Sequence, residues 1–455
     1  MTVTISRLLG CSFGVISCLV VGQAWAADEE DDVVVTAKPV DAKPAEAKPA
    51  EPKPIEPKPT DAKGALAETL RHLSFSGFVQ ADYHGSQASE PELTQGGVLL
   101  NENRFLIRAA RPRLDADYTY AQAQLELDAN TVKGPEVRLF HAFGTALLPG
   151  PREGAPPIVA ASLGLMDTPF GYEVGLLPQR AQLFGERSLA SRAFFPGIPD
   201  LGLRLFGGLS FVRWSFGLMN GSPLDTTYAA RAPMSPRDVS FRLGVDTHPT
   251  RKIELRGGVS GLRGKGFHPG TDASKNAISW TDVNEDGVIQ PSELQALPAT
   301  AAAPSVLFDR WLVGADVQVL LHTKLGLSQL SAEVFVASNM DRGFAIADPV
   351  LLGQNTRELG AYVSFIQELG RYALVGLRYD YYDPNLDALD TRAGKLVPGN
   401  QAVHTVAPMV GAVLPGHARL LFEYDVVRDH LGRDASGLPT DLKNDGFNLR
   451  LQVDL

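Results

Sequence analysis

The sequence predicts an all-β protein, a transmembrane antiparallel β-barrel of about sixteen strands. Three observations lead to this prediction. Apolar and polar residues alternate with period two from residue 73 to the end of the chain. The polar side of the alternation carries charged or amide side chains in nearly every strand. Long and short connections between the strands follow one another in turn, as a closed barrel that crosses a membrane requires.

Composition excludes two other classes of protein. The chain has 455 residues, 44% of them apolar and 21% charged, with a net charge of −10. After residue 26, no stretch approaches the roughly 18 uncharged apolar residues that a membrane-spanning helix needs, which excludes a helical membrane protein. The acidic balance, without any cluster of basic and aromatic residues, argues against a nucleic-acid-binding protein.

Residues 1–26 are predicted to be a secretory signal peptide. Arg7 supplies the positive start, Leu8 to Val21 the apolar core, and Ala24-Trp25-Ala26 the small-residue cleavage pattern. Both cysteines, Cys11 and Cys18, lie inside this segment. A lipid-attachment site at Cys18 is an alternative interpretation. The mature chain is therefore expected to have neither disulfides nor a cysteine-based metal site.

Residues 27–63 are predicted to be a Lys/Pro-rich periplasmic linker. Lys-Pro pairs recur every five residues, at 38–39, 43–44, 48–49, 53–54 and 58–59. Proline at this density favours extended polyproline II, which makes a stiff and solvated spacer. The segment is interpreted as a plain spacer or as a tether to peptidoglycan. Residues 64–72 form a short lead-in to the barrel, which extends from residue 73 to residue 455.

The last nine residues show the alternation most clearly. Phe447, Leu449, Leu451, Val453 and Leu455 share one face, and polar residues occupy the positions between them. A soluble β-sandwich would also bury one face of each strand. A closed barrel with lipid outside and water inside is favoured because charged residues line the other face over about 380 residues without a helical layer. The connections expected at the outer side are 86–101, 130–136, 167–199, 221–236, 264–307, 340–356, 384–400 and 430–446.

Three segments resemble the phosphate-selective porin O/P family of outer-membrane channels. The first runs from Asp167-Thr168-Pro169-Phe170-Gly171-Tyr172-Glu173 through Gly185-Glu186-Arg187-Ser188-Leu189 to Phe195-Pro196-Gly197-Ile198-Pro199-Asp200-Leu201-Gly202. The second is Leu377-Arg378-Tyr379-Asp380-Tyr381-Tyr382-Asp383-Pro384-Asn385, and the third is the closing segment Asn444 to Leu455. The resemblance implies a third outer loop, here 167–199, that folds into the lumen and narrows it. It also implies a homotrimer.

The family's phosphate binders line their pore with arginines, whose guanidinium groups match phosphate oxygens. Strand parity and the third loop give the pore and constriction residues expected here: Arg104, Arg108, Arg180, Glu186, Arg187, Arg192, Arg204, Arg213, Arg242 and Arg378. By the same parity, the arginines on the inward faces of the strands are matched by an equal number of inward acids. A balanced wall gives a positive potential only where the arginines cluster, so a preference for anions or phosphate depends on the constriction.

The long connection 264–307 contains an EF-hand-like calcium loop. The twelve residues from Asp282 to Glu293 match the EF-hand pattern at every ligand position. The expected ligands of Ca²⁺ are Asp282, Asn284, Asp286, the carbonyl of Val288, Gln290 through water, and Glu293. No second loop is present to pair with this one, so weak structural binding is expected, although a polar loop that only resembles such a site is the alternative.

The expected function follows from these observations. The chain is predicted to be an outer-membrane porin that lets small polar solutes diffuse passively, with or without a preference for anions such as phosphate. A structural or adhesive outer-membrane barrel, tethered through its linker, is the alternative. An enzyme is not expected, because the nine histidines are scattered and no nucleophile elbow or zinc spacing accompanies them.

Overall fold

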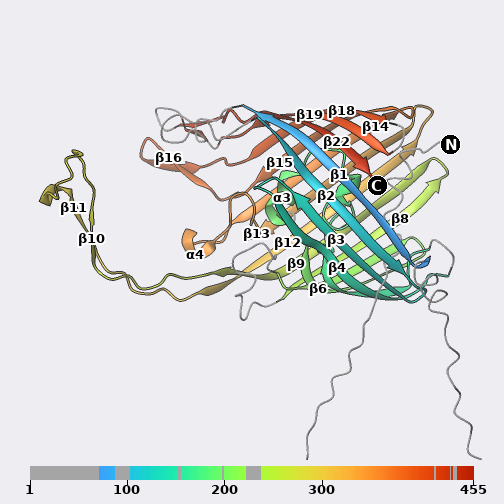
Figure 1. Cartoon of the computed structure of the whole chain (residues 1–455), viewed down its shortest axis with the longest axis horizontal. Coiled ribbons are helices and arrows are strands. Elements are labelled where there is room, and N and C mark those ends of the chain that lie inside the picture. Colours follow the sequence, from blue (N-terminus) through green and yellow to red (C-terminus); the bar gives the residue numbers. More distant parts are fainter. Residues whose placement is uncertain are drawn as a thin grey trace, which may run out of the picture.

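The predicted strands form one closed barrel (Figure 1). The computed structural model describes residues 71–87, 103–151, 155–196, 199–221, 237–414, 417–430, 432–433 and 438–455. The predicted signal peptide, the Lys-Pro linker and the lead-in up to residue 70 lie outside the described residues.

Each barrel strand is antiparallel to its neighbours. The barrel strands are β1 (Leu73–Ser86), β2 (Arg104–Asp117), β3 (Ala121–Asn130), β4 (Glu136–Leu148), β5 (Val159–Met166), β6 (Asp200–Leu209), β7 (Val212–Met219), β8 (Asp238–Thr250), β9 (Ile253–His268), β12 (Val306–His322), β13 (Leu327–Ser338), β14 (Arg357–Leu369), β15 (Ala373–Asp383), β18 (Val403–Leu414), β19 (Ala418–Arg428) and β22 (Gly446–Asp454). The prediction of about sixteen strands is therefore confirmed.

The other elements lie in the connections. They are the two-stranded pairs β10 (Ala277–Trp280) with β11 (Leu294–Leu297), β16 (Leu389–Arg392) with β17 (Lys395–Pro398), and β20 (Gly432–Arg433) with β21 (Pro439–Thr440), and the short helices η2 (Gln179–Ala181), α3 (Leu189–Phe194), η3 (Pro291–Glu293) and α4 (Pro349–Leu352). No helix in the described part of the chain is long and apolar enough to span a membrane.

The first and last strands close the barrel. β1 pairs with β22 from Phe78 opposite Asp454 to Ser86 opposite Gly446. Within this seam Arg450 donates two hydrogen bonds to the carboxylate of Asp82, at 2.8 and 2.7 Å. Closure leaves the sheet without an unpaired edge, which is what a β structure needs in hydrocarbon.

The two faces of the wall differ as the alternation predicts. On β12, the inward Asp316 and Gln318 are 7% and 1% exposed, while the outward Val313 and Val317 are 55% and 42% exposed. The polar side chains are buried inside the barrel, and the apolar ones form an outer belt. This is the arrangement of a transmembrane β-barrel, whose outer belt is covered by lipid.

The long connections lie at one end of the barrel. In Figure 1 the β10–β11 pair, α4 and β16 all lie at the left end, and the carboxyl terminus lies toward the other end. The β10–β11 pair projects far from the wall. The opposite end carries short turns, such as residues 251–252 and 370–372. The predicted outer connections coincide with the observed ones to within a few residues.

Two β-bulges change which side chains face inward. The β1–β2 register shifts at Gln80 and Ala81, which are opposite Ala109 and Ile107, so Arg108 is an extra residue on β2. The β3–β4 register shifts in the same way and leaves Phe140 as an extra residue on β4. Beyond each bulge, the inward-facing positions of the bulged strand shift by one residue. The period-two pattern of the sequence does not reveal this shift.

Candidate functional site

The connection between β5 and β6, residues 167–199, folds into the barrel. We call it the lumenal loop; the structure describes all of it except residues 197–198. Figure 1 shows its helix α3 enclosed by the barrel strands. The third outer loop therefore folds inward, as predicted.

The start of the lumenal loop is bound to β13 by a buried carboxylate. The backbone N–H groups of Tyr172 and Glu173 donate to the two oxygens of Glu333, at 2.9 and 3.2 Å. Gly171 just before them has a φ of +60°, and a Cβ there would collide with the Glu333 carboxylate. A glycine is thus required where the loop makes its closest approach to the wall.

Glu173 in turn fixes the start of α3. Its carboxylate accepts hydrogen bonds from the Ser188 N–H, at 3.0 and 2.9 Å, and from the Ser188 hydroxyl, at 2.5 Å. Ser188 is also the N-cap of α3, because its hydroxyl accepts from Ser191 N–H. The start of the loop is therefore tied to the start of α3 inside the lumen.

The end of α3 packs into an apolar cluster inside the barrel. The Phe194 ring lies 6.0 Å from that of Phe335 on β13 and 5.6 Å from that of Tyr382 on β15, both edge to face. Phe170 stacks on Phe335 at 6.2 Å. All four aromatic side chains are fully buried. This cluster holds the loop against the β13–β15 side of the wall.

The middle of the loop is held by arginines that donate to its carbonyls. Arg419 on β19 donates to the carbonyls of Arg180 and Gln182. Arg450 on β22 donates to Gly185 O at 2.9 Å, and Arg378 on β15 donates to Glu186 O at 2.7 Å. These wall arginines are therefore used to hold the loop.

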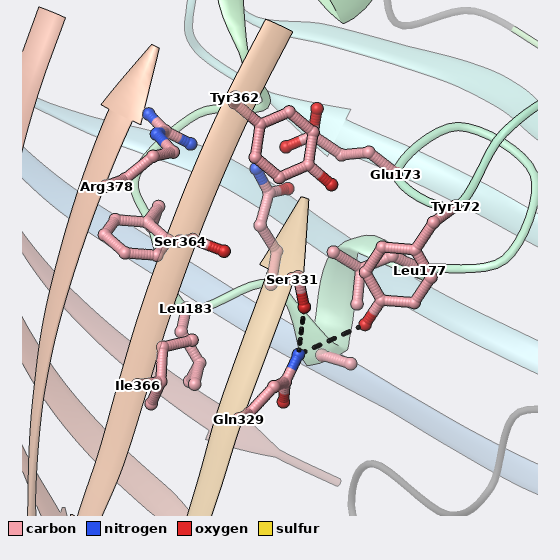
Figure 2. Close-up of a pocket in the computed structure, with 13 residues that line it drawn as sticks. Tyr172, Glu173, Leu177, Leu183, Gln329, Ser331, Tyr362, Ser364, Ile366 and Arg378 are labelled. Carbon is pink, nitrogen blue, oxygen red and sulfur yellow. Dashed lines mark hydrogen bonds between the residues drawn. The ribbon is translucent and has the colours of Figure 1, made fainter. Parts of the chain in front are cut away.

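Little space remains between the lumenal loop and β13–β15. A cavity of about 30 Å³ lies there, lined by Tyr172, Glu173 and Leu177 of the loop and by Gln329 and Tyr362 of the wall (Figure 2). Figure 2 shows Gln329 donating to the hydroxyls of Ser331 and Tyr172, which bridges wall and loop. This volume has room for one or two water molecules. The lumenal loop therefore packs closely against the β13–β15 wall.

The β2–β6 side carries charged side chains that face the loop. Arg108 donates to Glu186 of the loop at 2.7 Å. Arg111 lies 2.9 Å from Asp128 and stacks over Phe140, with its guanidinium carbon 3.5 Å from the ring centre. Arg138 also pairs with Asp128, at 3.3 Å. His141 lies 3.4 Å from Asp167, at the start of the loop, and 3.1 Å from Glu126.

Some arginines in the lumenal loop and on β6 have no carboxylate partner. Among the described residues, Arg187, Arg192 and Arg204 have no carboxylate within 4 Å of their guanidinium nitrogens. Arg204 lies over Phe206, with its guanidinium carbon 4.7 Å from the ring centre. Burial opposes ionisation of Glu186, but Arg108, Arg192 and Arg450 nevertheless hold the pKa of this loop carboxyl below its usual range. Glu186 and Asp128 are paired with arginines, whereas the partner of Asp167 is His141, which is charged only when protonated. Arg187, Arg192 and Arg204 therefore add positive charge to this region, part of which Asp167 offsets.

The other four predicted pore residues lie at four further places. Arg104 is exposed at the outer end of β2 and donates to Val132 O at 2.9 Å. Arg242 is buried and pairs with Asp316 at 2.6 Å, and Arg213 lies 3.6 Å from Asp246 near the opposite end. Arg180 lies on η2, and its own guanidinium has no ion pair among the described residues.

Arg111 on β2 faces the lumen, although strand parity predicts that it faces outward. Counting by two from Arg104 and Arg108 places Arg111 on the outer face, whereas the bulge at Arg108 turns it inward. It is 5% exposed and fixes Asp128. The alternation of apolar and polar residues along β2 does not reveal the bulge. The only local sign of an irregular strand is Pro112, which has no backbone N–H to donate to a neighbouring strand.

A second inward connection, residues 339–356, clamps the end of α3. The Arg342 guanidinium donates two hydrogen bonds to Phe194 O, at 2.7 and 3.1 Å, and its backbone N–H donates to Ala193 O at 2.8 Å. The last carbonyls of α3 are thereby satisfied. Asp341 next to it accepts from the Tyr382 hydroxyl at 2.6 Å, which ties the clamp to β15.

The predicted calcium loop lies at the tip of the projecting β10–β11 pair. Asp282 accepts from Gly287 N–H at 2.7 Å, and Asp286 accepts from Val288 N–H at 2.7 Å and from the Gln290 side chain at 2.9 Å. Glu293 accepts from the Trp280 indole N–H at 3.0 Å. Within the described residues, no group of three or more histidine, cysteine or acidic side chains is gathered in a geometry that could hold a metal ion.

The comparisons with known proteins agree on the fold. The chain matches no protein-family model and no curated protein. Among solved structures it is similar to OprB of Pseudomonas putida, with 11% identity over 87% of this chain and 97% of that one and a TM-score of 0.54. It is also similar to the outer-membrane channel DcaP of Acinetobacter baumannii, with 11% identity over 84% and 97% and a TM-score of 0.51. The fold is that of an outer-membrane porin.

Proposed function

We propose that this chain is an outer-membrane porin through which small polar solutes diffuse passively, with a preference for anions. One observation carries the proposal. The lumenal loop is bound to the β13–β15 side. We infer that solutes pass on its β2–β6 side, which we call the passage, near Arg187 and Arg192 of the loop and Arg204 of β6, which have no carboxylate partner among the described residues. Fixed cations at a narrow passage lower the barrier for anions and raise it for cations.

Phosphate is the anion that we favour. Guanidinium groups bind phosphate oxygens through paired hydrogen bonds. The resemblance of three segments to the phosphate-selective porin O/P family supports the same solute. The outer-membrane channels with the same fold support an outer-membrane location and an absence of enzymatic activity.

The test is the reversal potential of the purified protein in planar bilayers under a potassium chloride gradient. We expect a chloride-over-potassium preference that falls by at least about twofold in Arg187→Ala/Arg192→Ala, because each arginine contributes positive potential at the passage. Arg251→Ala/Lys252→Ala, at a turn away from the passage, is the matched control. Phosphate should compete with chloride in the wild type. An unchanged reversal potential in the loop variant would remove these residues from the selectivity mechanism.

A homotrimer is proposed on the basis of the outer face of β3 and β4. The outward pairs Ala121–Ala146, Ala123–Gly144 and Leu125–Ala142 place small residues over two neighbouring strands. In a membrane, such surfaces allow close backbone approach between subunits. For the Lys-Pro repeat, which lies outside the described residues, we propose a periplasmic spacer that reaches toward peptidoglycan.

Weak calcium binding is proposed for the loop Asp282–Glu293. Support comes from its match to the EF-hand ligand pattern and from φ values of +56° at Glu285 and +71° at Gly287, which form the sharp bend that such loops need. Ca²⁺ would be held by the side chains of Asp282, Asn284, Asp286 and Glu293, the Val288 carbonyl and a water on Gln290.

A structural or adhesive role is the second candidate. It is favoured by the projection of the β10–β11 pair far from the wall (Figure 1). Conductance separates the two functions, because a purely structural barrel passes no steady current.

A further inference from the structure

An apolar groove lies on the outer surface of the barrel, apart from the lumen. It has a volume of about 360 Å³ and lies over β5, β6 and β7. Its walls are Leu163, Leu201, Leu203 and Leu218, and the backbone of Gly164 and Gly202, which are directly opposite each other, also lines it. Two facing glycines leave the space that side chains fill elsewhere on the wall.

Strand register places this groove on the lipid side. Leu163 is opposite Leu203, Leu203 is opposite Leu218, and Leu218 is opposite Val239, so the four residues share one face. Leu163 is 69% exposed and Val239 40% exposed in the isolated chain. Both belong to the outer belt, which lies in the membrane.

One cationic side chain lines the groove, and a second lies on the same outward face on the strand β9. Arg237 lines the groove and donates to the Asn220 side chain. It lies two residues before Val239, and Arg263 on β9 is directly opposite Val239. Lys265 follows two residues later and is paired with Asp309 at 2.6 Å. Arg237 and Arg263 have no carboxylate partner within 4 Å among the described residues.

The cations lie at the end of the barrel that carries the long connections. β7 ends at Met219 and β8 begins at Asp238, so Asn220 and Arg237 mark the outer rim. An acyl chain in the groove would therefore run inward from this rim, with its headgroup beside the arginines. Apolar walls, with Arg237 at the outer rim and Arg263 on the same outward face, match an amphiphile whose polar end carries phosphate.

We propose that this groove is a binding site for a phosphorylated lipid of the outer leaflet. One acyl chain occupies the groove between Leu163 and Leu218, and the phosphate binds Arg237 and Arg263. The proposal requires the barrel to lie in an outer membrane, and it is independent of conduction through the lumen.

The test uses the full-length protein in detergent, incubated with diphosphoryl lipid A and analysed by native mass spectrometry. We expect the lipid-bound fraction to fall by about tenfold in Arg237→Gln/Arg263→Gln, since each basic residue near an anionic lipid contributes to binding. Leu203→Trp, which fills the groove, should reduce it similarly. The matched control is Arg251→Gln/Lys252→Gln at the other end of β8 and β9, which should bind as the wild type does. Heat-modifiable gel mobility verifies that every variant is a folded barrel.

Three results would overturn the proposal. One is equal lipid retention by the wild type and a folded Arg237→Gln/Arg263→Gln variant. Another is equal retention of dephosphorylated lipid A, which would indicate an apolar contact without phosphate recognition. The third is displacement of the lipid by millimolar inorganic phosphate, which would assign the two arginines to free phosphate.

Discussion

Arg204 is the wall residue whose charge is least compensated at the passage. It has no ion pair among the described residues and lies over Phe206. We predict that Arg204→Gln lowers the chloride-over-potassium permeability ratio by about twofold to threefold, since it removes one fixed charge from a narrow, weakly screened site. Bilayer reversal potentials measure this ratio.

Arg213→Gln is the control for that prediction. Arg213 also faces inward, but it pairs with Asp246 at 3.6 Å and lies away from the lumenal loop. Its loss should change the ratio less than the loss of Arg204 does. Equal effects of the two substitutions would indicate that the whole lumen, and not the passage, determines selectivity.

At the residue scale, the sequence predicted side-chain direction well within unbroken strands. Arg204, Arg242 and Arg378 face inward as strand parity predicted. Arg111 was missed because a bulge is an irregularity of pairing, and pairing partners cannot be read from one strand alone. Strand parity predicts equal numbers of inward arginines and inward acids. It does not predict which of them pair, because pairing depends on strand register.

The clamp at residues 339–356 gives a prediction at the scale of elements. Arg342→Gln removes a charged donor from Phe194 O, and such hydrogen bonds contribute about 1.5–3 kcal/mol. We predict that the lumenal loop then leaves its position more often, so that open-channel noise rises and mean conductance increases. Single-channel recording measures both.

Arg371→Gln is the matched control, because Arg371 lies in a short turn at the opposite end and stacks on Tyr372. A conductance trace from Arg342→Gln that matches both this control and the wild type would show that the clamp does not position the loop.

The β10–β11 pair gives a second prediction at this scale. The Trp280 indole N–H donates to Glu293, the proposed bidentate calcium ligand. This hydrogen bond is the main cause of a pKa of Glu293 below its usual range, so the ligand is ionised throughout the neutral range. Adding millimolar calcium should therefore change Trp280 fluorescence, and a chelator should reverse the change.

Glu293→Gln tests the origin of that signal. The amide keeps the size of the side chain but removes the charge that calcium needs, so the fluorescence response should disappear. A response that persists in Glu293→Gln, or no response in the wild type up to several millimolar calcium, would contradict calcium binding at this loop.

Element positions were predictable because alternation continues through each strand and stops at each long connection. The third outer connection was placed at 167–199, and the strands beside it end at Met166 and begin at Asp200. What the sequence could not show was the wall against which this loop packs. That choice depends on Glu333, Phe335 and Tyr382, which come from strands far along the chain.

The proposed trimer gives a prediction at the scale of the whole molecule. Ala123→Phe inserts a bulky side chain into the small-residue face of β3 and β4 and should prevent close approach of subunits. Val363→Phe, on the outward face of β14, is the control, because Val363 lies among larger apolar residues. Light scattering of the detergent-solubilised protein measures the mass. A wild-type monomer, or a trimer that persists in Ala123→Phe, would contradict this interface.

The proposed function depends on solutes crossing between the lumenal loop and β2–β6. Both cysteines of the chain lie within residues 1–26, the proposed signal peptide, so in protein without this segment a single introduced cysteine is the only thiol. Arg204→Cys places a thiol at the passage, and Ser364→Cys places one in the small cavity behind the loop. Single-channel current during addition of a negatively charged methanethiosulfonate reagent is the most direct measurement. We expect a stepwise loss of current in Arg204→Cys and none in Ser364→Cys. A loss of current in Ser364→Cys but not in Arg204→Cys would show that solutes pass behind the loop instead.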